Sequence, residues 1–83
     1  MKKMVITGAN GFLGRNAKEY FEKRYEITGI DLAENYNGEK TQYHNISYYQ
    51  CNMSQDSAEM ATIFTSVQPD VIIHCAGSAN VGA

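Results

Sequence analysis

The sequence predicts an α/β fold in which a doubly wound parallel sheet carries one helix on each face. The first observation is that short apolar segments alternate with amphipathic segments along the 83 residues. Their order is β-α-β-loop-β-α-β, and strands that alternate with helices form parallel sheets through right-handed crossovers. The second observation is a glycine-rich turn where the first strand gives way to the first helix. We therefore expect the first four strands of such a sheet.

The first half of the chain predicts two strands around one helix. Residues 3–7 form a compact apolar run that ends at Gly8, which is typical of a buried strand. Residues 12–24 place apolar side chains at helical spacing and predict a one-faced helix. Its apolar positions are Leu13, Ala17, Tyr20 and Phe21, and its expected solvent-facing positions are Arg15, Lys18, Glu19, Glu22 and Lys23. Residues 25–31 alternate and then end at an acid, as a second strand would.

The second half predicts a loop, a third strand, a helix and a fourth strand. Residues 33–45 are polar, contain asparagine and glycine, and show no period, which indicates a loop. Residues 46–51 are β-branched and aromatic, which favours a strand. Residues 54–56 can cap a helix that Pro69 then ends. The apolar positions of this helix are Met60, Ile63, Phe64 and Val67. Residues 71–76 (VIIHCA) predict the most apolar strand.

Charge and composition exclude several functions. The formal net charge of −2 offers no electrostatic basis for binding nucleic acid or an anionic membrane. No apolar run approaches about 18 residues, and the N-terminus lacks the apolar region of a signal peptide, so we expect a cytoplasmic protein. Cys51 and Cys75 lack the spacing of a metal site. We interpret them as buried free thiols rather than as a disulfide or metal ligands.

The glycine-rich turn at residues 7–14 (TGANGFLG) is the strongest functional motif. Gly8 allows a tight turn out of the strand, Gly11 lets the backbone approach a pyrophosphate, and Gly14 lets the helix pack against the sheet. Backbone amides at the start of the helix then face the phosphates, and the helix dipole adds attraction. This context predicts dinucleotide binding. A P-loop is excluded, because no Gly-Lys-Ser/Thr ends the turn.

Asp31, at the end of the second predicted strand, indicates which dinucleotide would bind. A carboxylate there can accept hydrogen bonds from both ribose hydroxyls and would repel a 2′-phosphate, which predicts NAD rather than NADP as the cofactor. The alternative is that the glycines only shape a tight turn and Asp31 only caps a strand.

Two motifs resemble the extended short-chain dehydrogenase/reductase family, the NAD-dependent epimerases and dehydratases of nucleotide sugars. TGANGFLG is similar to the N-terminal signature of that family. Residues 69–77 (PDVIIHCAG) resemble its fourth strand, and residues 78–82 are closest to its UDP-glucose 4-epimerase branch. The resemblance covers the whole chain. It implies a Rossmann-type sheet with strand order 3-2-1-4, of which residues 1–83 would be the N-terminal, incomplete portion, without a second domain.

The resemblance also implies a set of cofactor contacts. It places the pyrophosphate along the turn, the ribose at the end of the second strand, the adenine after the third strand, and the fourth strand beneath the cofactor. The implied residues, in that order, are Gly8, Asn10, Gly11, Phe12, Leu13 and Gly14; Asp31 and Asn35; Asn52 and Met53; and Cys75, Ala76 and Gly77. Two positions depart from the family: Asn52 replaces an aspartate, and Ala79 replaces a lysine frequent in the epimerase branch.

Catalysis in this family rests on a Ser/Thr and a Tyr-x-x-x-Lys pair, which the resemblance places beyond this stretch, so no catalytic residue is expected. One string, Tyr36 to Lys40, matches the spacing, but Gly38 and its neighbouring asparagines disfavour the helix that the pair requires, and we interpret it as a coincidence. His74 is interpreted as a satisfied core histidine and Ser78 as a loop residue. Asp56 and Glu59 are interpreted as first-turn charges of a helix.

Three hypotheses remain open at this point. The leading one is the NAD-binding portion of a nucleotide-sugar epimerase or dehydratase, a fragment or truncated product that is catalytically silent alone. A second is a non-catalytic NAD-binding or sensing module on the same fold, and a third is a damaged remnant that binds nothing. The expected partners are NAD and, only together with a C-terminal part, a nucleotide sugar. The unfinished sheet edge at the fourth strand predicts self-association or marginal stability.

Overall fold

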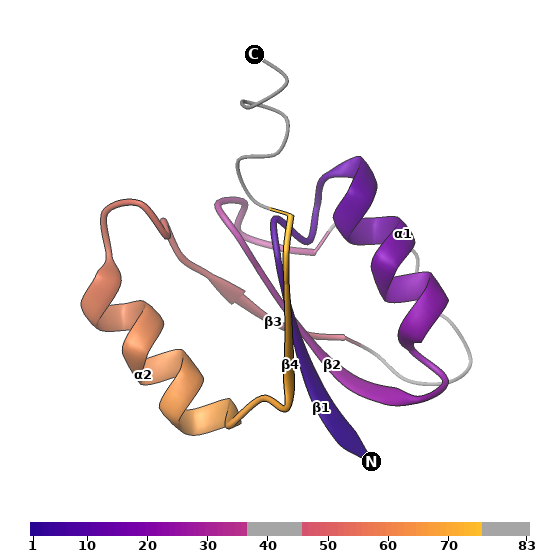
Figure 1. Cartoon of the computed structure of the whole chain (residues 1–83). Coiled ribbons are helices and arrows are strands. Elements are labelled where there is room, and N and C mark those ends of the chain that lie inside the picture. The colour runs from indigo at the N-terminus through magenta and orange to yellow at the C-terminus, as the bar shows by residue number, and fades with distance from the viewer. Residues whose placement is uncertain (37–45, 76–83) are drawn as a thin grey trace.

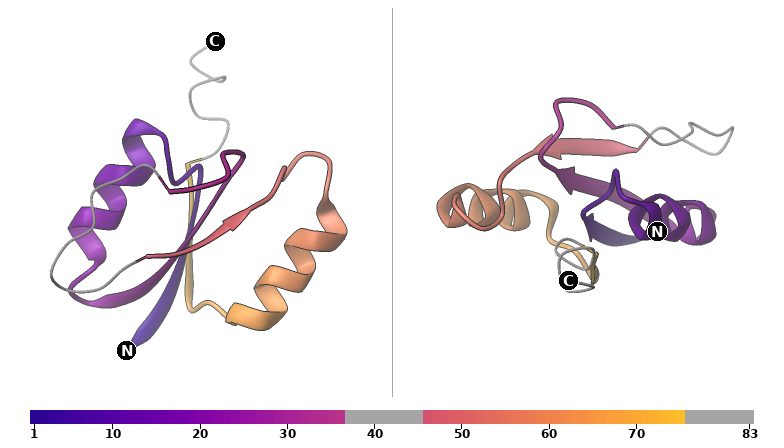
Figure 2. Two further views of the ribbon diagram at one scale, coloured as in Figure 1. Left: turned by 180° about the vertical axis from the view of Figure 1, so that it is seen from behind. Right: turned by 90° about the horizontal axis from the view of Figure 1, so that it is seen from above.

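The computed structural model describes residues 1–36 and 46–75. In these residues, four parallel strands form one sheet in the order β3-β2-β1-β4, as predicted. The strands are β1 (Lys2–Thr7), β2 (Tyr25–Asp31), β3 (Ser47–Gln50) and β4 (Val71–His74). The helices are α1 (Phe12–Phe21) and α2 (Ser57–Val67), and they lie on opposite faces of the sheet (Figures 1 and 2). The architecture is therefore Rossmann-like and confirms the predicted fold class.

The strand register brings the functional segments to one edge of the sheet. Thr7 at the end of β1 lies between Ile30 of β2 and His74 of β4. Asp31 at the end of β2 pairs with Gln50 at the end of β3. Because parallel strands end at the same edge, the segments that follow all four strands meet there.

Each face of the sheet packs its own apolar cluster, because successive side chains of a strand point to opposite faces. On the α1 face, Met4 and Ile6 of β1 pack with Ala9 and Ile27. On the α2 face, Val5 of β1 packs with residues that come from β2, the end of β3 and α2. These residues are Ile30, Cys51 and Ile63. β1 is therefore covered on both faces, as a central parallel strand requires.

The face that α1 presents to the sheet differs from the prediction. Lys18 and Glu22, expected to face solvent, are only 0% and 4% exposed, and their side chains form an ion pair of 2.7 Å between Nζ and Oε1. Leu13 and Tyr20, expected to face inward, are 54% and 70% exposed. The orientation of the helix follows from Gly14, which faces the turn before it. The positions three, four, seven and eight residues later, which include Lys18 and Glu22, face inward with it. The other expected solvent-facing residues, Arg15, Glu19 and Lys23, are exposed.

Several element limits also differ from the predictions. α1 ends at Phe21 rather than at residue 24, β3 spans 47–50 rather than 46–51, and β4 ends at His74 rather than at residue 76. β1 begins one residue earlier than predicted, and β2 has the predicted limits. The segment predicted as a loop, residues 33–45, is irregular over residues 33–36, and its residues 37–45 lie outside the described part of the chain.

The ends of α2 and β4 show how local chemistry sets these limits. Asp56 is the N-cap of α2, although its side chain makes no capping hydrogen bond, and Gln68 closes the helix in the left-handed region, with φ 52°, just before Pro69. His74 is exposed rather than in the core, and its Nδ1 lies 2.7 Å from Thr7 Oγ1. His74 therefore has a hydrogen-bond partner, as predicted, but it lies at the surface, because it is the last residue of an edge strand.

β4 lies at one edge of the described sheet, and its Ile72 side chain is 50% exposed. The expected self-association through this edge stays a prediction. Among the described residues, no helix has both the length and the apolar content needed to cross a membrane.

Candidate functional site

Backbone hydrogen bonds shape the turn between β1 and α1 and tie it to β2. Gly8 adopts the left-handed region, with φ 69°, which confirms that a glycine is needed to leave the strand. Its N–H donates to Ile30 O at 2.8 Å, and the N–H of Ala9 donates to the same carbonyl at 3.2 Å. The N–H of Gly11 then donates to Gly8 O at 3.1 Å. The turn is thereby fastened to the end of β2.

Gly14 allows the close contact between helix and turn that the sequence predicts. A Cβ at this position would collide with the carbonyl oxygen of Gly8 and would lie 2.8 Å from the Cα of Ala9. Both obstacles are backbone atoms, which cannot move aside as a flexible side chain could. Gly14 is therefore required for the packing of α1.

Gly11 has no such requirement inside the protein. Its φ of −76° suits any residue, and a Cβ there would approach Gly8 O no closer than 3.4 Å. It is the N-cap of α1 and has no side chain to cap the helix. The first amides of the helix therefore receive no cap from it, and the next two side chains, Phe12 and Leu13, are 74% and 54% exposed.

Asp31 is oriented by two backbone amides at the carboxyl end of β2. Its Oδ2 accepts from the N–H of Asn10 at 2.8 Å, and its Oδ1 accepts from the N–H of Leu32 at 2.8 Å. The first of these bonds links the carboxylate to the glycine-rich turn. Each carboxylate oxygen has two lone pairs, so both can still accept another hydrogen bond.

Side chains from β3 and the turn hold the exposed segment that follows Asp31. The Tyr48 hydroxyl donates to Ala33 O at 2.6 Å, and Gln50 Nε2 donates to Leu32 O at 3.1 Å. The amide Nδ2 of Asn10 donates to Asn35 O at 3.1 Å and to the Tyr48 hydroxyl at 3.2 Å. Sequence reasoning missed Tyr48 and Gln50, because a long-range bond from a strand to a loop leaves no local pattern.

Burial raises the pKa of the Tyr48 phenol, and the nearby Asp31 carboxylate raises it further, against an opposing hydrogen bond from Asn10. The phenol therefore remains protonated near neutral pH and can act as the donor to Ala33 O.

Sequence reasoning also missed a glycine, Gly29 in the middle of β2. A Cβ there would lie 2.8 Å from Ala9 Cβ and 2.9 Å from Ile46 Cδ1. Because Gly29 has no Cβ, Ala9 and the turn that contains it can pack against β2. A glycine inside a strand is the signal that could have indicated this close approach.

The residues expected around the adenine follow the end of β3. The Oδ1 of Asn52 accepts from the N–H of Ser54 at 3.1 Å and from its hydroxyl at 2.8 Å, so this acceptor is already engaged. Met53 is half-buried and packs against the cluster on the α2 face.

The residues expected beneath the cofactor follow β4. The N–H of Cys75 donates to Thr7 O at 3.0 Å, which places it beside the start of the turn. Burial raises the pKa of its thiol. Ala76, Gly77, Ser78 and Ala79 lie outside the described residues. Lys40, the last residue of the Tyr-x-x-x-Lys string, also lies outside the described residues. Its first residue, Tyr36, is half-buried and packs against the cluster on the α1 face.

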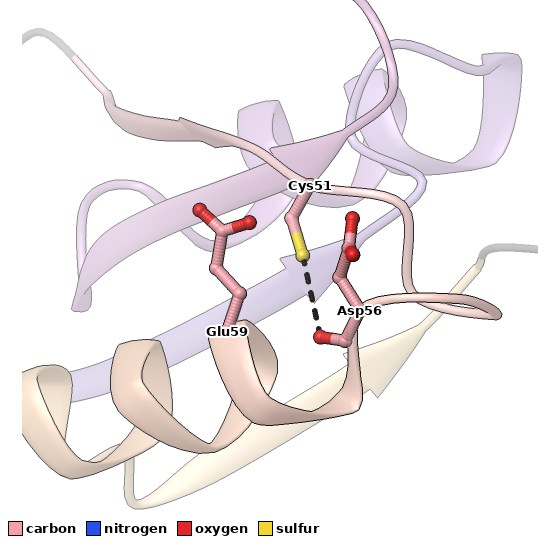
Figure 3. A group of neighbouring side chains, drawn as sticks. All are labelled: Cys51, Asp56 and Glu59. Carbon is pink, nitrogen blue, oxygen red and sulfur yellow. Dashed lines mark hydrogen bonds between the residues drawn. The ribbon is translucent and has the colours of Figure 1, made fainter.

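Cys51 is buried and not disulfide-bonded, as predicted, and lies beside two carboxylates of α2 (Figure 3). One ligand atom from each of Cys51, Asp56 and Glu59 lies within 4.8 Å of the others. Burial, followed by the negative charges of Glu59 and Asp56, raises the pKa of this thiol. Cys51 is thus held as the neutral thiol, which is a poor nucleophile and a poor metal ligand. Both acids are exposed and occupy the start of α2, as expected for first-turn charges.

Comparison with protein families identifies the chain. Residues 4–83 match the model of the NAD dependent epimerase/dehydratase family. The chain belongs to this family. A search of curated protein sequences found no match.

Solved structures share the fold of the chain. UDP-glucose 4-epimerase from Thermotoga maritima, solved with UDP-glucose, is 23% identical with a TM-score of 0.69, over 89% of this chain and 24% of that one. The Bordetella bronchiseptica enzyme WbmH, solved with NAD+, is 25% identical with a TM-score of 0.70, over 92% and 26%. WbmG from the same organism, solved with NAD and UDP, is 26% identical with a TM-score of 0.72, over 89% and 24%. The family member described here therefore spans about a quarter of the length of these enzymes.

Proposed function

We propose that the carboxyl edge of this sheet binds the ADP moiety of NAD. In this proposal, the amides that begin α1 hold the pyrophosphate, Asp31 holds the adenosine ribose, and Asn52 and Met53 flank the adenine. Doubly wound sheets bind ligands at this edge, where the strand order reverses, here between β1 and β4. Cys75 follows β4 at that point, and the proposal extends to Ala76 and Gly77.

The observation that carries the proposal is the placement of Asp31 relative to the turn. Its carboxylate is hydrogen-bonded to the N–H of Asn10, two residues after Gly8 and directly before Gly11. A ribose acceptor and a phosphate-binding turn are thus in direct contact. Gly11 supports the same proposal, because the protein itself gives no steric reason for a glycine there, whereas close approach of a pyrophosphate would give one.

The activity of the whole protein is a broader proposal. Family membership and the likeness to WbmG, which was solved with NAD and UDP, support an oxidoreductase of the epimerase or dehydratase type that acts on a nucleotide sugar. The Tyr-x-x-x-Lys pair that such chemistry uses has no helical counterpart in residues 1–36 or 46–75. We therefore propose that this stretch binds the cofactor and is catalytically silent by itself.

The test is calorimetric titration of the 83-residue chain with NAD+ and with NADP+. We expect NAD+ to bind more tightly, because the Asp31 carboxylate accepts from the ribose hydroxyls and repels a 2′-phosphate. Loss of a hydrogen bond to a charged group costs about 1.5–3 kcal/mol, so Asp31→Asn should weaken NAD+ binding by about tenfold or more.

Asp70→Asn is the matched control. It removes the same charge at the amino ends of the parallel strands, where Asp70 Oδ2 accepts from the N–H of Lys3 at 2.8 Å. This variant should bind NAD+ as the natural chain does. A chain that is folded by circular dichroism and binds neither dinucleotide would overturn the proposal, and a preference for NADP+ would overturn the role of Asp31.

A further inference from the structure

We propose that Tyr48 and Asn10 are positioning residues for the adenosine ribose, an inference that rests on the proposed NAD site. Neither side chain is proposed to touch the reacting atoms. Their task is to hold the segment after β2 so that the Asp31 carboxylate stays in place for the ribose hydroxyls.

The segment after β2, residues 32–35, belongs to no helix or strand. Residues 32–35 are exposed and follow the last residue of β2. Leu32 is 61% exposed, so apolar burial contributes little to fixing it. Ordering each residue of such a segment costs conformational entropy, which other contacts must offset.

Side-chain donors supply these contacts at three backbone carbonyls. Those of Leu32, Ala33 and Asn35 accept from Gln50, Tyr48 and Asn10, respectively. The contact from Tyr48 is the shortest of the three, at 2.6 Å. All three donors come from the rigid frame of the site, either from β3 or from the glycine-rich turn.

Asn10 joins these contacts to Asp31. Its backbone N–H donates to Asp31 Oδ2 at 2.8 Å, while its side-chain amide reaches both Asn35 O and the Tyr48 hydroxyl. The turn, the carboxylate, the segment after β2 and β3 therefore form one hydrogen-bonded unit. Loss of the Tyr48 hydroxyl removes the donor to Ala33 and one acceptor of Asn10 together.

Tyr48 is suited to this role because its phenol stays in the donor form. Burial and the Asp31 carboxylate both raise its pKa. The ring of Tyr36 lies 6.3 Å away between centroids, so the Tyr48 ring is also packed. Tyr48→Phe keeps that packing and removes only the hydroxyl.

The experiment compares the affinities of ADP and 2′-deoxy-ADP for the natural chain, Tyr48→Phe, Asn10→Ala and the control Tyr49→Phe. Tyr49 is the next residue of β3, is 38% exposed, and points to the other face of the sheet. The natural chain and Tyr49→Phe should favour ADP by about tenfold or more, the ratio expected for a hydrogen bond to a carboxylate. Tyr48→Phe and Asn10→Ala should reduce that ratio to about threefold or less.

The ratio of the affinities for ADP and 2′-deoxy-ADP separates positioning from a purely structural role. Loss of folded protein weakens the binding of both ligands equally and leaves this ratio unchanged. An unchanged ratio in folded Tyr48→Phe and Asn10→Ala would therefore overturn the inference while the NAD site stands. If the natural chain binds neither ADP nor its deoxy form, the proposed function fails and this inference fails with it. Should one variant not fold, the other decides.

Discussion

At the scale of single residues, the structure requires Gly14 but does not itself require Gly11. Gly14 sits where any side chain would meet the backbone of the turn, whereas Gly11 has ordinary dihedral angles and room for a methyl group inside the protein. Gly14 therefore serves the fold, whereas the role of Gly11 belongs to the proposed NAD site.

Alanine at each position separates these two roles. Gly14→Ala should lower the free energy of unfolding by about 1–3 kcal/mol, the usual cost of overpacking. Gly11→Ala should change stability by less than about 1 kcal/mol, since alanine is only a poorer N-cap, yet weaken NAD+ binding through contact of its methyl group with the pyrophosphate. Urea unfolding and calorimetric titration of both variants measure this. A Gly11→Ala chain with unchanged affinity would contradict the proposed phosphate site.

At the scale of elements, the roll of α1 explains the buried ion pair between Lys18 and Glu22. Contact of Gly14 with the turn decides which side of the helix faces the sheet. Two charged residues four positions apart then become buried together, where they can neutralise each other. A buried pair adds little net stability, but removing one partner of a buried pair costs about 3–5 kcal/mol.

Glu22→Gln should therefore destabilise the chain strongly, by about 3 kcal/mol. Glu19→Gln, the same change at an exposed position of α1, should alter stability by about 0.5 kcal/mol or less. Replacement of both partners, Lys18→Met with Glu22→Leu, should be more stable than Glu22→Gln alone. Urea denaturation followed by circular dichroism gives all three values. Equal effects of Glu22→Gln and Glu19→Gln would show that the ion pair is dispensable.

The elements also show what sequence reasoning can reach. β2 was predicted to the residue because an alternating pattern stops at the polar Asp31, and the turn was predicted because three glycines follow a strand. The burial of Lys18 was not predicted, because hydropathy places every charged residue in solvent unless a partner is known. Tyr48 was not predicted, because its partner lies in another element and no spacing records that contact.

At the scale of the whole molecule, two phenols and two thiols, all buried or half-buried, respond to pH in the same direction. The pKa values of Tyr36, Tyr48, Cys51 and Cys75 are all raised, with burial as the largest cause. The fold therefore favours the neutral form of each group. Their contribution to stability is complete below the ordinary thiol pKa of 9.0 and is lost as the pH rises through the raised values.

The free energy of unfolding should accordingly fall as the pH rises through the range that begins at 9.0 for the thiols and at 10.0 for the phenols. Tyr36→Phe should make this decline shallower, because one of the shifted groups is gone, whereas Tyr20→Phe, at a residue 70% exposed, should not. Urea titrations at several pH values give the slope. A stability that is constant across this range would show that burial does not perturb these groups.

The central place of β1 has a consequence for how the chain is made. β2 follows β1 closely along the chain and can pair with it early, but the other neighbour of β1, β4, begins only at Val71. The contacts between Lys3 and Asp70 join residues 67 positions apart. Because such distant contacts close late, one edge of the most buried strand stays open until β4 has been made. The nascent chain is therefore most exposed to mispairing at the strand that the finished protein hides best.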